Sequence, residues 1–186
     1  LRMLGFDTVF DTSFSADLTV IEEANELLYK LKNGEQKYPL GNSLPLFTSC
    51  CPAWVRFVET KYPELLPYVS TCKSPMEMFG AVLKEYYKPA DEEAGMETVS
   101  VAVMPCVAKK HEAAREEFKR NEVPDVDYVI TTKELILMIK ELGIQFDEIE
   151  PSAPDMPFSI NSGAGVIFGV TGGVMEAALR HVADKN

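Results

Sequence analysis

The sequence predicts an α/β fold in which strands and helices alternate along the chain. Residues 98–104 (TVSVAVM) are β-branched and nearly all apolar, as expected for a strand buried on both faces of a parallel sheet. Residues 125–130 predict a second strand, and the segments around both strands show apolar residues at helical spacing. We therefore expect mixed or parallel sheets flanked by helices, with any site in a cleft at the strand ends.

The first half of the chain predicts three helices and one short strand. Residues 17–32 form the first helix, with Ser15 or Asp17 capping its start and Gly34 ending it. Its apolar face contains Val20, Ala24, Leu27, Leu28 and Leu31. Residues 44–47 predict a strand, and Thr48-Ser49 then offer caps for a helix through Val58. A further helix is expected over residues 75–87, ended by Pro89.

The second half combines the two strands with two more helices. Thr131 and Glu134 form a capping box for a helix that ends near Gly143. Residues 162–173 contain five glycines and predict an irregular segment before a helix that begins at Val174.

Composition excludes several classes of protein. The net charge of −11 argues against a nucleic-acid binder, which needs a basic face. No apolar run reaches the length of about 18 residues that a membrane span needs. The chain has four cysteines, at positions 50, 51, 72 and 106, and its first residues lack the charge layout and apolar core of a secretion signal. We expect free thiols or metal ligands in the cytoplasm or another reducing, anaerobic compartment.

Two ordered motifs carry a family resemblance. Residues 48–54 read TSCCPAW and residues 104–112 read MPCVAKKHE. Together with KSP at 73–75 and IFGVTGGVMEAALR at 167–180, they resemble iron-only (FeFe) hydrogenases. The resemblance implies that residues 1–186 are part of a single catalytic domain, and we expect that domain to continue beyond both ends.

The resemblance implies a specific cofactor. In that family a 4Fe–4S cubane held by four cysteines is linked to a di-iron subsite that carries CO, cyanide and a dithiolate bridge. Cys51 and Cys106 match two of the cubane ligands, and the other two belong to a third motif that this chain does not contain. Spacing alone leaves open that both cysteines are buried structural thiols, because neither lies in a CxxC pair.

The resemblance also implies a proton path. Cys50 matches the acid–base group beside the di-iron subsite, and a thiol can exchange protons near neutral pH. Glu23, Glu26 and Ser70 match the members that lead protons to it, and Lys30 lies at the outer end. The alternative is a solvated, charged helix face, because Glu23, Glu26 and Lys30 share one flank of the first helix.

Five other residues match the cofactor pocket of the family. The lysine at the position of Lys109 donates a hydrogen bond to cyanide there, and four more residues line the di-iron subsite: Ser74, Pro75, Met104 and Phe168. Met76 replaces a polar residue found in many relatives, and Cys72, which lies outside any motif, is interpreted as structural.

The resemblance implies reversible reduction of protons to H2, with electrons supplied by a ferredoxin or similar carrier. Two alternatives share the family but not this activity: proteins of iron–sulfur assembly and hydrogenase-derived sensory domains. The doubled cysteine at positions 50 and 51 argues against both. Because the third motif is missing, we expect the chain in isolation to be inactive.

Overall fold

The structure is a computed structural model that describes residues 1–33 and 44–184. The chain divides into two compact units. The sheet unit contains Leu1–Asp11 and Phe79–Ile160, and the helical unit contains Thr12–Met78 and Asn161–Asn186. Within the described residues, no helix has the length and apolar character needed to cross a membrane.

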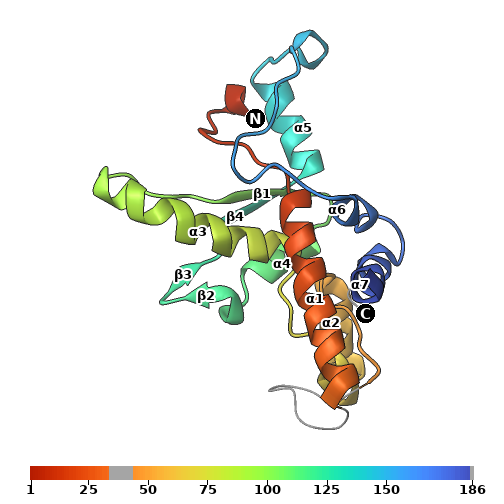
Figure 1. Cartoon of the computed structure of the whole chain (residues 1–186). Helices are drawn as coiled ribbons and strands as arrows, with labels where there is room; N and C mark the ends of the chain where they lie inside the picture. Colours follow the sequence, from red (N-terminus) through yellow and green to blue (C-terminus); the bar gives the residue numbers. More distant parts are fainter. Residues whose placement is uncertain (34–43, 185–186) are drawn as a thin grey trace. The chain divides into compact units, whose positions relative to one another are not determined.

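A short parallel sheet organises the sheet unit. Strand β1 (Val101–Met104) pairs in parallel with β4 (Tyr128–Thr131), so that Met104 lies opposite Thr131 at their carboxyl ends (Figure 1). Helices α4 (Ala108–Ala113) and α5 (Thr132–Glu141) both contact β4. Because both strands end at the same edge, the residues that follow β1 and begin α5 gather there.

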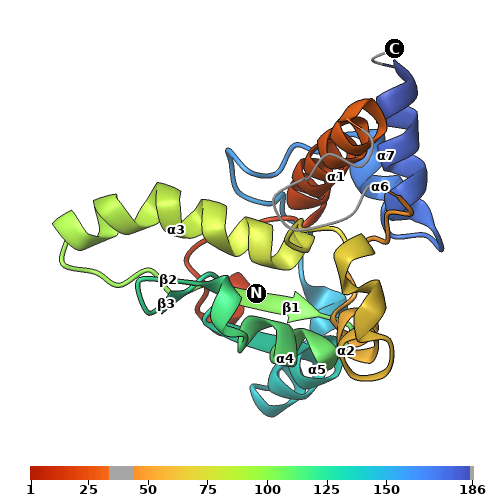
Figure 2. The ribbon, with the colours of Figure 1, turned by 90° about the horizontal axis from the view of Figure 1, so that it is seen from below.

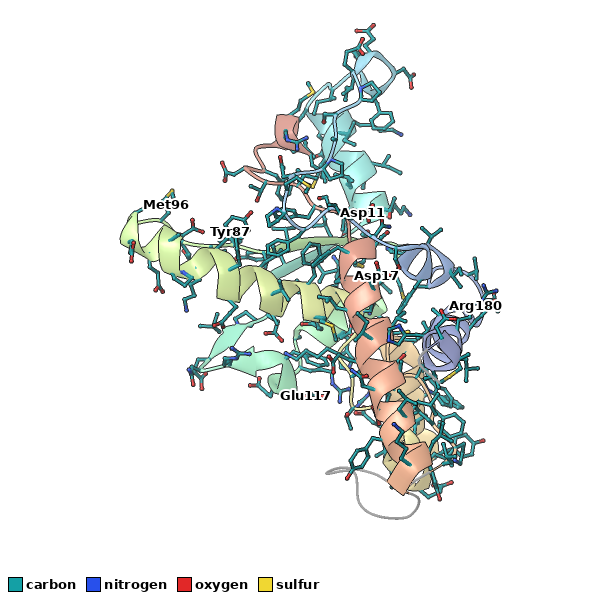
Figure 3. The ribbon with its side chains drawn as sticks, in the orientation of Figure 1. Asp11, Asp17, Tyr87, Met96, Glu117 and Arg180 are labelled. Atoms are coloured by element: carbon teal, nitrogen blue, oxygen red, sulfur yellow. The ribbon has the colours of Figure 1, made fainter. Side chains whose placement is uncertain are left out.

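The remaining elements of the sheet unit are short, apart from α3 (Pro75–Glu93), which begins in the helical unit. An antiparallel ribbon joins β2 (Lys119–Arg120) to β3 (Val123–Pro124). The 3-10 turns are η1 (Arg2–Leu4), η3 (Glu116–Phe118) and η4 (Phe146–Glu148). An aromatic group packs Phe10 against Phe79, Phe158 and Tyr87, the last of which is labelled on α3 in Figure 3.

Two long helices form the core of the helical unit. Helix α1 (Ser13–Asn33) lies alongside α7 (Gly173–Asp184), as both Figure 1 and Figure 2 show. Four buried residues join them: Ala24, Leu27, Ala178 and Val182. The unit also contains α2 (Pro52–Lys61), η2 (Pro63–Tyr68) and α6 (Gly163–Ile167).

The structure confirms the α/β class and the capping box at Thr131, but several predicted boundaries were wrong. Helix α1 starts at Ser13, so Ser15 lies inside it and donates to the Thr12 carbonyl at 2.9 Å. Asp17 lies near the start of α1 (Figure 3) but does not cap it. It accepts hydrogen bonds from the amide and the hydroxyl of Ser162. Leu31 is exposed, so the apolar face ends before it, and Gly34 lies outside the described residues.

Other corrections concern the segments around the site. Residues 44–47 form no strand, and only a single parallel bridge joins Phe47 to Val69. Helix α3 continues past Pro89, because the carbonyl that loses its N–H partner belongs to the exposed Glu85 and can bind water. β1 is shorter than predicted and only half-buried. The glycine-rich segment contains α6, and a Cβ at Gly173 would collide with the Ile167 carbonyl oxygen.

Candidate active site

Three charged side chains of α1 are buried on one flank of the helix. Glu23 and Glu26 are each 1% exposed, and Lys30 is 3% exposed. A solvated helix face is therefore excluded for these residues. Because an ionised side chain is costly to bury, each of the three needs polar partners or a neutral form.

Glu26 has an ion pair on one carboxylate oxygen and hydrogen bonds on the other. Its Oε1 pairs with Lys30 Nζ at 2.9 Å, one helical turn further along α1. Its Oε2 accepts from the Ser70 hydroxyl at 2.9 Å and from the Thr71 amide at 3.1 Å. Two longer contacts come from Thr71 Oγ1 at 3.4 Å and Cys72 Sγ at 3.7 Å. The segment 70–72 therefore wraps the carboxylate with hydrogen-bond donors.

Glu23 has far fewer partners. Its Oε1 accepts one long hydrogen bond, 3.5 Å from the Ser49 amide, and its Oε2 accepts none from the described residues. Burial raises the pKa of Glu23 to about 7, and the nearby charge of Glu26 also raises it, while the Ser49 amide and the Ser70 hydroxyl lower it. A carboxyl with this pKa holds and releases a proton near neutral pH.

The doubled cysteine lies directly after the Ser49 amide that contacts Glu23. Cys50 is half-buried, whereas Cys51 is exposed and forms the N-cap of α2, with Pro52 as the first helical residue. Sequence analysis predicted Thr48-Ser49 as the caps, and the helix begins later because Pro52 suits the first helical position. The unpaired amides and dipole of the helix N-terminus favour negative charge beside Cys51.

The second motif lies at the carboxyl edge of the sheet. Cys106 is exposed and follows β1 by two residues. Lys109 Nζ pairs with Glu112 at 2.7 Å, and Glu112 is only 3% exposed. The buried carboxylate of Glu112, one helical turn beyond Lys109, thus holds the Lys109 ammonium in place. Cys106 belongs to the sheet unit and Cys51 to the helical unit, and the expected approach of their sulfurs stays a prediction.

The four other predicted pocket residues have structural environments of their own. Ser74 is buried, and its hydroxyl accepts from the Glu77 amide at 3.4 Å at the start of α3, where Pro75 is the first residue. Met104 is the half-buried last residue of β1, and Phe168 is half-buried just after α6. Their proposed contact with a cofactor stays a prediction.

Three residues that contact the carboxylates were not predicted from the sequence: Ser49, Thr71 and Cys72. Ser49 was assigned as a helix cap, yet its hydroxyl donates to the Cys72 carbonyl at 2.6 Å. Cys72 was interpreted as a structural thiol, and its sulfur faces Glu26. The available signal was their proximity in sequence to Cys50 and Ser70, but only the folded chain shows which carboxylate they meet.

The two exposed thiols suit an iron–sulfur cluster as donors, because soft thiolates are its usual ligands. Over residues 1–33 and 44–184, no three His, Cys, Asp or Glu side chains come together in a metal-binding group. Cys51 and Cys106 are each exposed, so each can serve as a cluster ligand, and their sharing of one cluster stays a prediction. The role of Lys109 as a donor to an anionic ligand also stays a prediction.

Known proteins resemble this chain over almost its whole length. A family model described as "Iron only hydrogenase large subunit, C-terminal domain" matches residues 1–186. The NADP-reducing hydrogenase subunit HndD of Solidesulfovibrio fructosivorans is 50% identical over 97% of this chain and 31% of its own length. The Periplasmic Fe hydrogenase large subunit of Nitratidesulfovibrio vulgaris is 45% identical over 97% of this chain and 42% of its own.

One further relative and one solved structure also match this chain. Protein NAR1 of Arabidopsis thaliana is 36% identical over 98% of this chain and 42% of its own length. An FeFe hydrogenase HydA1 variant from Chlamydomonas reinhardtii superposes with a TM-score of 0.79 at 47% identity, covering 97% of this chain and 44% of that one. The chain thus spans less than half the length of each of these proteins. The match over all 186 residues shows that the chain belongs to the family of the iron-only hydrogenase large subunit, C-terminal domain.

Proposed function

We propose that this chain is part of an FeFe hydrogenase that reversibly reduces protons to H2 and contributes its proton path and two cluster ligands. The observation that carries the proposal is the buried pair of Glu23 and Glu26, in which the Ser70 hydroxyl contacts Glu26 and the Ser49 amide, one residue before Cys50, contacts Glu23. Burying two carboxyls lowers the stability of a fold. Pairs in which one carboxyl has many hydrogen-bond donors and the other has few are typical of sites of proton exchange.

Proton movement follows from the side chains themselves. Glu26 faces Lys30, and Ser70 donates to Glu26 Oε2 at 2.9 Å. When a proton reaches Glu26, the Ser70 hydroxyl can accept it and pass its own hydrogen to Glu23, whose pKa is about 7. Cys50, next to the Ser49 amide that binds Glu23, would receive the proton and deliver it to the reaction site. In the direction of H2 oxidation the same groups carry protons outward.

Cys51 and Cys106 would bind the 4Fe–4S part of the cofactor, with the remaining cysteine ligands supplied from outside this chain. Lys109 would donate to a cyanide ligand, as the resemblance implies, with Glu112 keeping the ammonium in place. Ser74, Pro75, Met104 and Phe168 would line the pocket. When bound, the cofactor supplies the redox chemistry that combines two protons with two electrons.

The partners follow from the reaction. Electrons would come from or go to a ferredoxin or a similar small carrier, since the residues described above move protons but not electrons. We propose a cytoplasmic location or another reducing, anaerobic compartment, because the four thiols are free. A relative named as periplasmic shows that the family is also found elsewhere.

A second candidate is a protein of iron–sulfur assembly without hydrogen chemistry. The 32% identity to a relative named Cytosolic Fe-S cluster assembly factor narfl, from Xenopus tropicalis, favours it. By resemblance, that class lacks the doubled cysteine, so Cys50 disfavours it. A buried carboxyl with a pKa near 7 also has no evident use in assembly alone.

The test is to load the natural protein that contains this chain with iron, sulfide and a synthetic di-iron subsite under anaerobic conditions. H2 evolution from a reduced viologen dye, together with iron content, would then be measured. Evolution that depends on the di-iron subsite supports the proposal. A protein that binds the iron–sulfur cluster in full but evolves no H2 would contradict it and favour assembly.

A further inference from the structure

Cys72 is the residue outside the family motifs that touches the proton path at the most points. Its sulfur lies 3.7 Å from Glu26 Oε2, and its amide donates to the Ser70 hydroxyl at 3.1 Å. Its carbonyl accepts from the Ser49 hydroxyl at 2.6 Å, and the Ser49 amide contacts Glu23. The three polar groups of one residue thus reach Glu26, Ser70 and the segment that holds Glu23.

These contacts fix directions as well as distances. A hydroxyl has one hydrogen to donate, and Ser70 Oγ accepts from the Cys72 amide. With this acceptor position occupied, the Ser70 hydrogen remains available to the carboxyls, and in the structure the hydroxyl donates to Glu26 Oε2. The Cys72 thiol adds a donor on the same oxygen, so Oε2 is surrounded by donors while the Glu23 carboxyl is not.

We propose that Cys72 is a positioning residue that keeps Glu26 as the acceptor carboxylate and Glu23 as the carboxyl that exchanges protons. This inference rests on the proposed function, because it assigns Cys72 to the proton path of that reaction. The thiol remains protonated and able to donate, since burial raises the pKa of Cys72 to about 12.

The alternative is that Cys72 merely fills space between α1 and the segment 70–72. Packing and positioning differ in one measurable property. Removing a donor from Glu26 Oε2 leaves negative charge on the two carboxyls less stabilised, so a proton added to the pair is bound more tightly. Removing only volume lowers the free energy of unfolding and leaves the proton affinity of the pair unchanged.

The experiment is an infrared titration of the protonated-carboxyl band in the metal-free full chain, with Glu23→Gln used to assign the band. Ionisable neighbours of the pair among the described residues include Lys30 and Cys72, and Glu22 acts on Cys72. In Cys72→Ala we expect the pair to bind its proton about two- to tenfold more tightly, as for the loss of one hydrogen bond. Cys72→Val, which retains volume but has no donor, should shift equally, and Cys72→Ser should restore the original midpoint.

Equal midpoints in the Ala, Val and Ser variants, each verified as folded by circular dichroism, would overturn the proposal. So would a Ser variant that shifts as far as the Ala variant. If Cys72→Ala does not fold, the comparison of Val with Ser decides alone. The titration uses no iron and no H2, so a natural protein that evolves no H2 would overturn the proposed function without changing this result.

Discussion

Glu23 in the helical unit and Glu134 in the sheet unit are the same residue type in opposite settings. Glu134 is 44% exposed and accepts from Lys110 Nζ at 2.6 Å and from the Thr131 amide at 2.7 Å. The Lys110 contact and the Thr131 donors lower its pKa to about 2. Glu23 is 1% exposed with one long hydrogen bond, and burial raises its pKa to about 7.

The difference shows what each environment can do. Water and strong donors keep Glu134 as a fixed anion that serves the start of α5. Burial with weak donors makes Glu23 a group whose proton is exchanged near neutral pH. If the comparison is right, substitutions at or beside Glu23 change chemistry, and those around Glu134 change only local stability.

The largest effect is expected for Cys50→Ser in the metal-loaded protein. A serine hydroxyl is nearly isosteric but exchanges protons poorly near neutral pH, so H2 evolution should fall by about 10²- to 10⁴-fold. Iron content should stay normal, whereas Cys51→Ser should lose or weaken the cubane. Full activity in Cys50→Ser with normal iron would refute the proton-transfer role, and lost iron would mean that the two cysteine roles are exchanged.

Glu23→Gln tests the comparison directly against Glu134→Gln. An amide cannot relay protons by titration, so the Glu23 variant should lose roughly 10²-fold in H2 evolution at unchanged iron content. The Glu134 variant should evolve H2 at the rate of the unsubstituted protein. Equal losses in the two variants would show that burial of Glu23 is not tied to turnover.

Local patterns predicted one half of this comparison. Thr131 and Glu134 lie three residues apart, and the capping box depends only on that spacing and on neighbouring backbone, so the structure confirmed it. The spacing of Glu23, Glu26 and Lys30 gave one helix flank but not its burial. Burial depends on segments 26 to 46 residues away, such as Ser49 and Cys72, and no local signal encodes that packing.

The same reason explains the errors and the successes around the site. The resemblance matched Ser70 to the proton path, and the structure places its hydroxyl on Glu26. The strand at 44–47 was wrong because a short apolar run does not determine whether a partner strand exists, and Phe47 meets only Val69. Cys72 was underestimated because its contacts are made largely through backbone atoms, which the side-chain type does not reveal.

An intermediate effect is expected in the stability of the metal-free chain. Moving the pKa of Glu23 from 4.5 unfolded to about 7 folded means that the native state binds more protons between these values. The free energy of unfolding should therefore fall as pH rises from 4.5 to 7, by about 3 kcal/mol in total, and level off above it. Glu23→Gln should remove this fall in urea titrations, while the exposed Glu64→Gln should not. Identical pH profiles for the two variants would contradict the raised pKa.

The smallest effect is expected at the other end of the comparison, for Thr131→Ala. The Thr131 hydroxyl accepts from the Glu134 amide at 3.2 Å, and its loss should lower the free energy of unfolding by about 1 kcal/mol at pH 7. Thr60→Ala is the matched control, because the Thr60 hydroxyl contacts carbonyls within α2 and caps no helix. The Glu134 carboxylate adds a pH dependence to this helix start. Its pKa is lowered, so its contribution to the free energy of unfolding is complete above pH 4.5 and lost as pH falls toward about 2. The Glu134→Gln substitution should therefore lower the free energy of unfolding at pH 7 and have no effect near pH 2, in urea titrations at both pH values. An effect of Thr131→Ala no larger than that of Thr60→Ala would show that this exposed box adds nothing, and that the donors of Glu134 act on its charge alone.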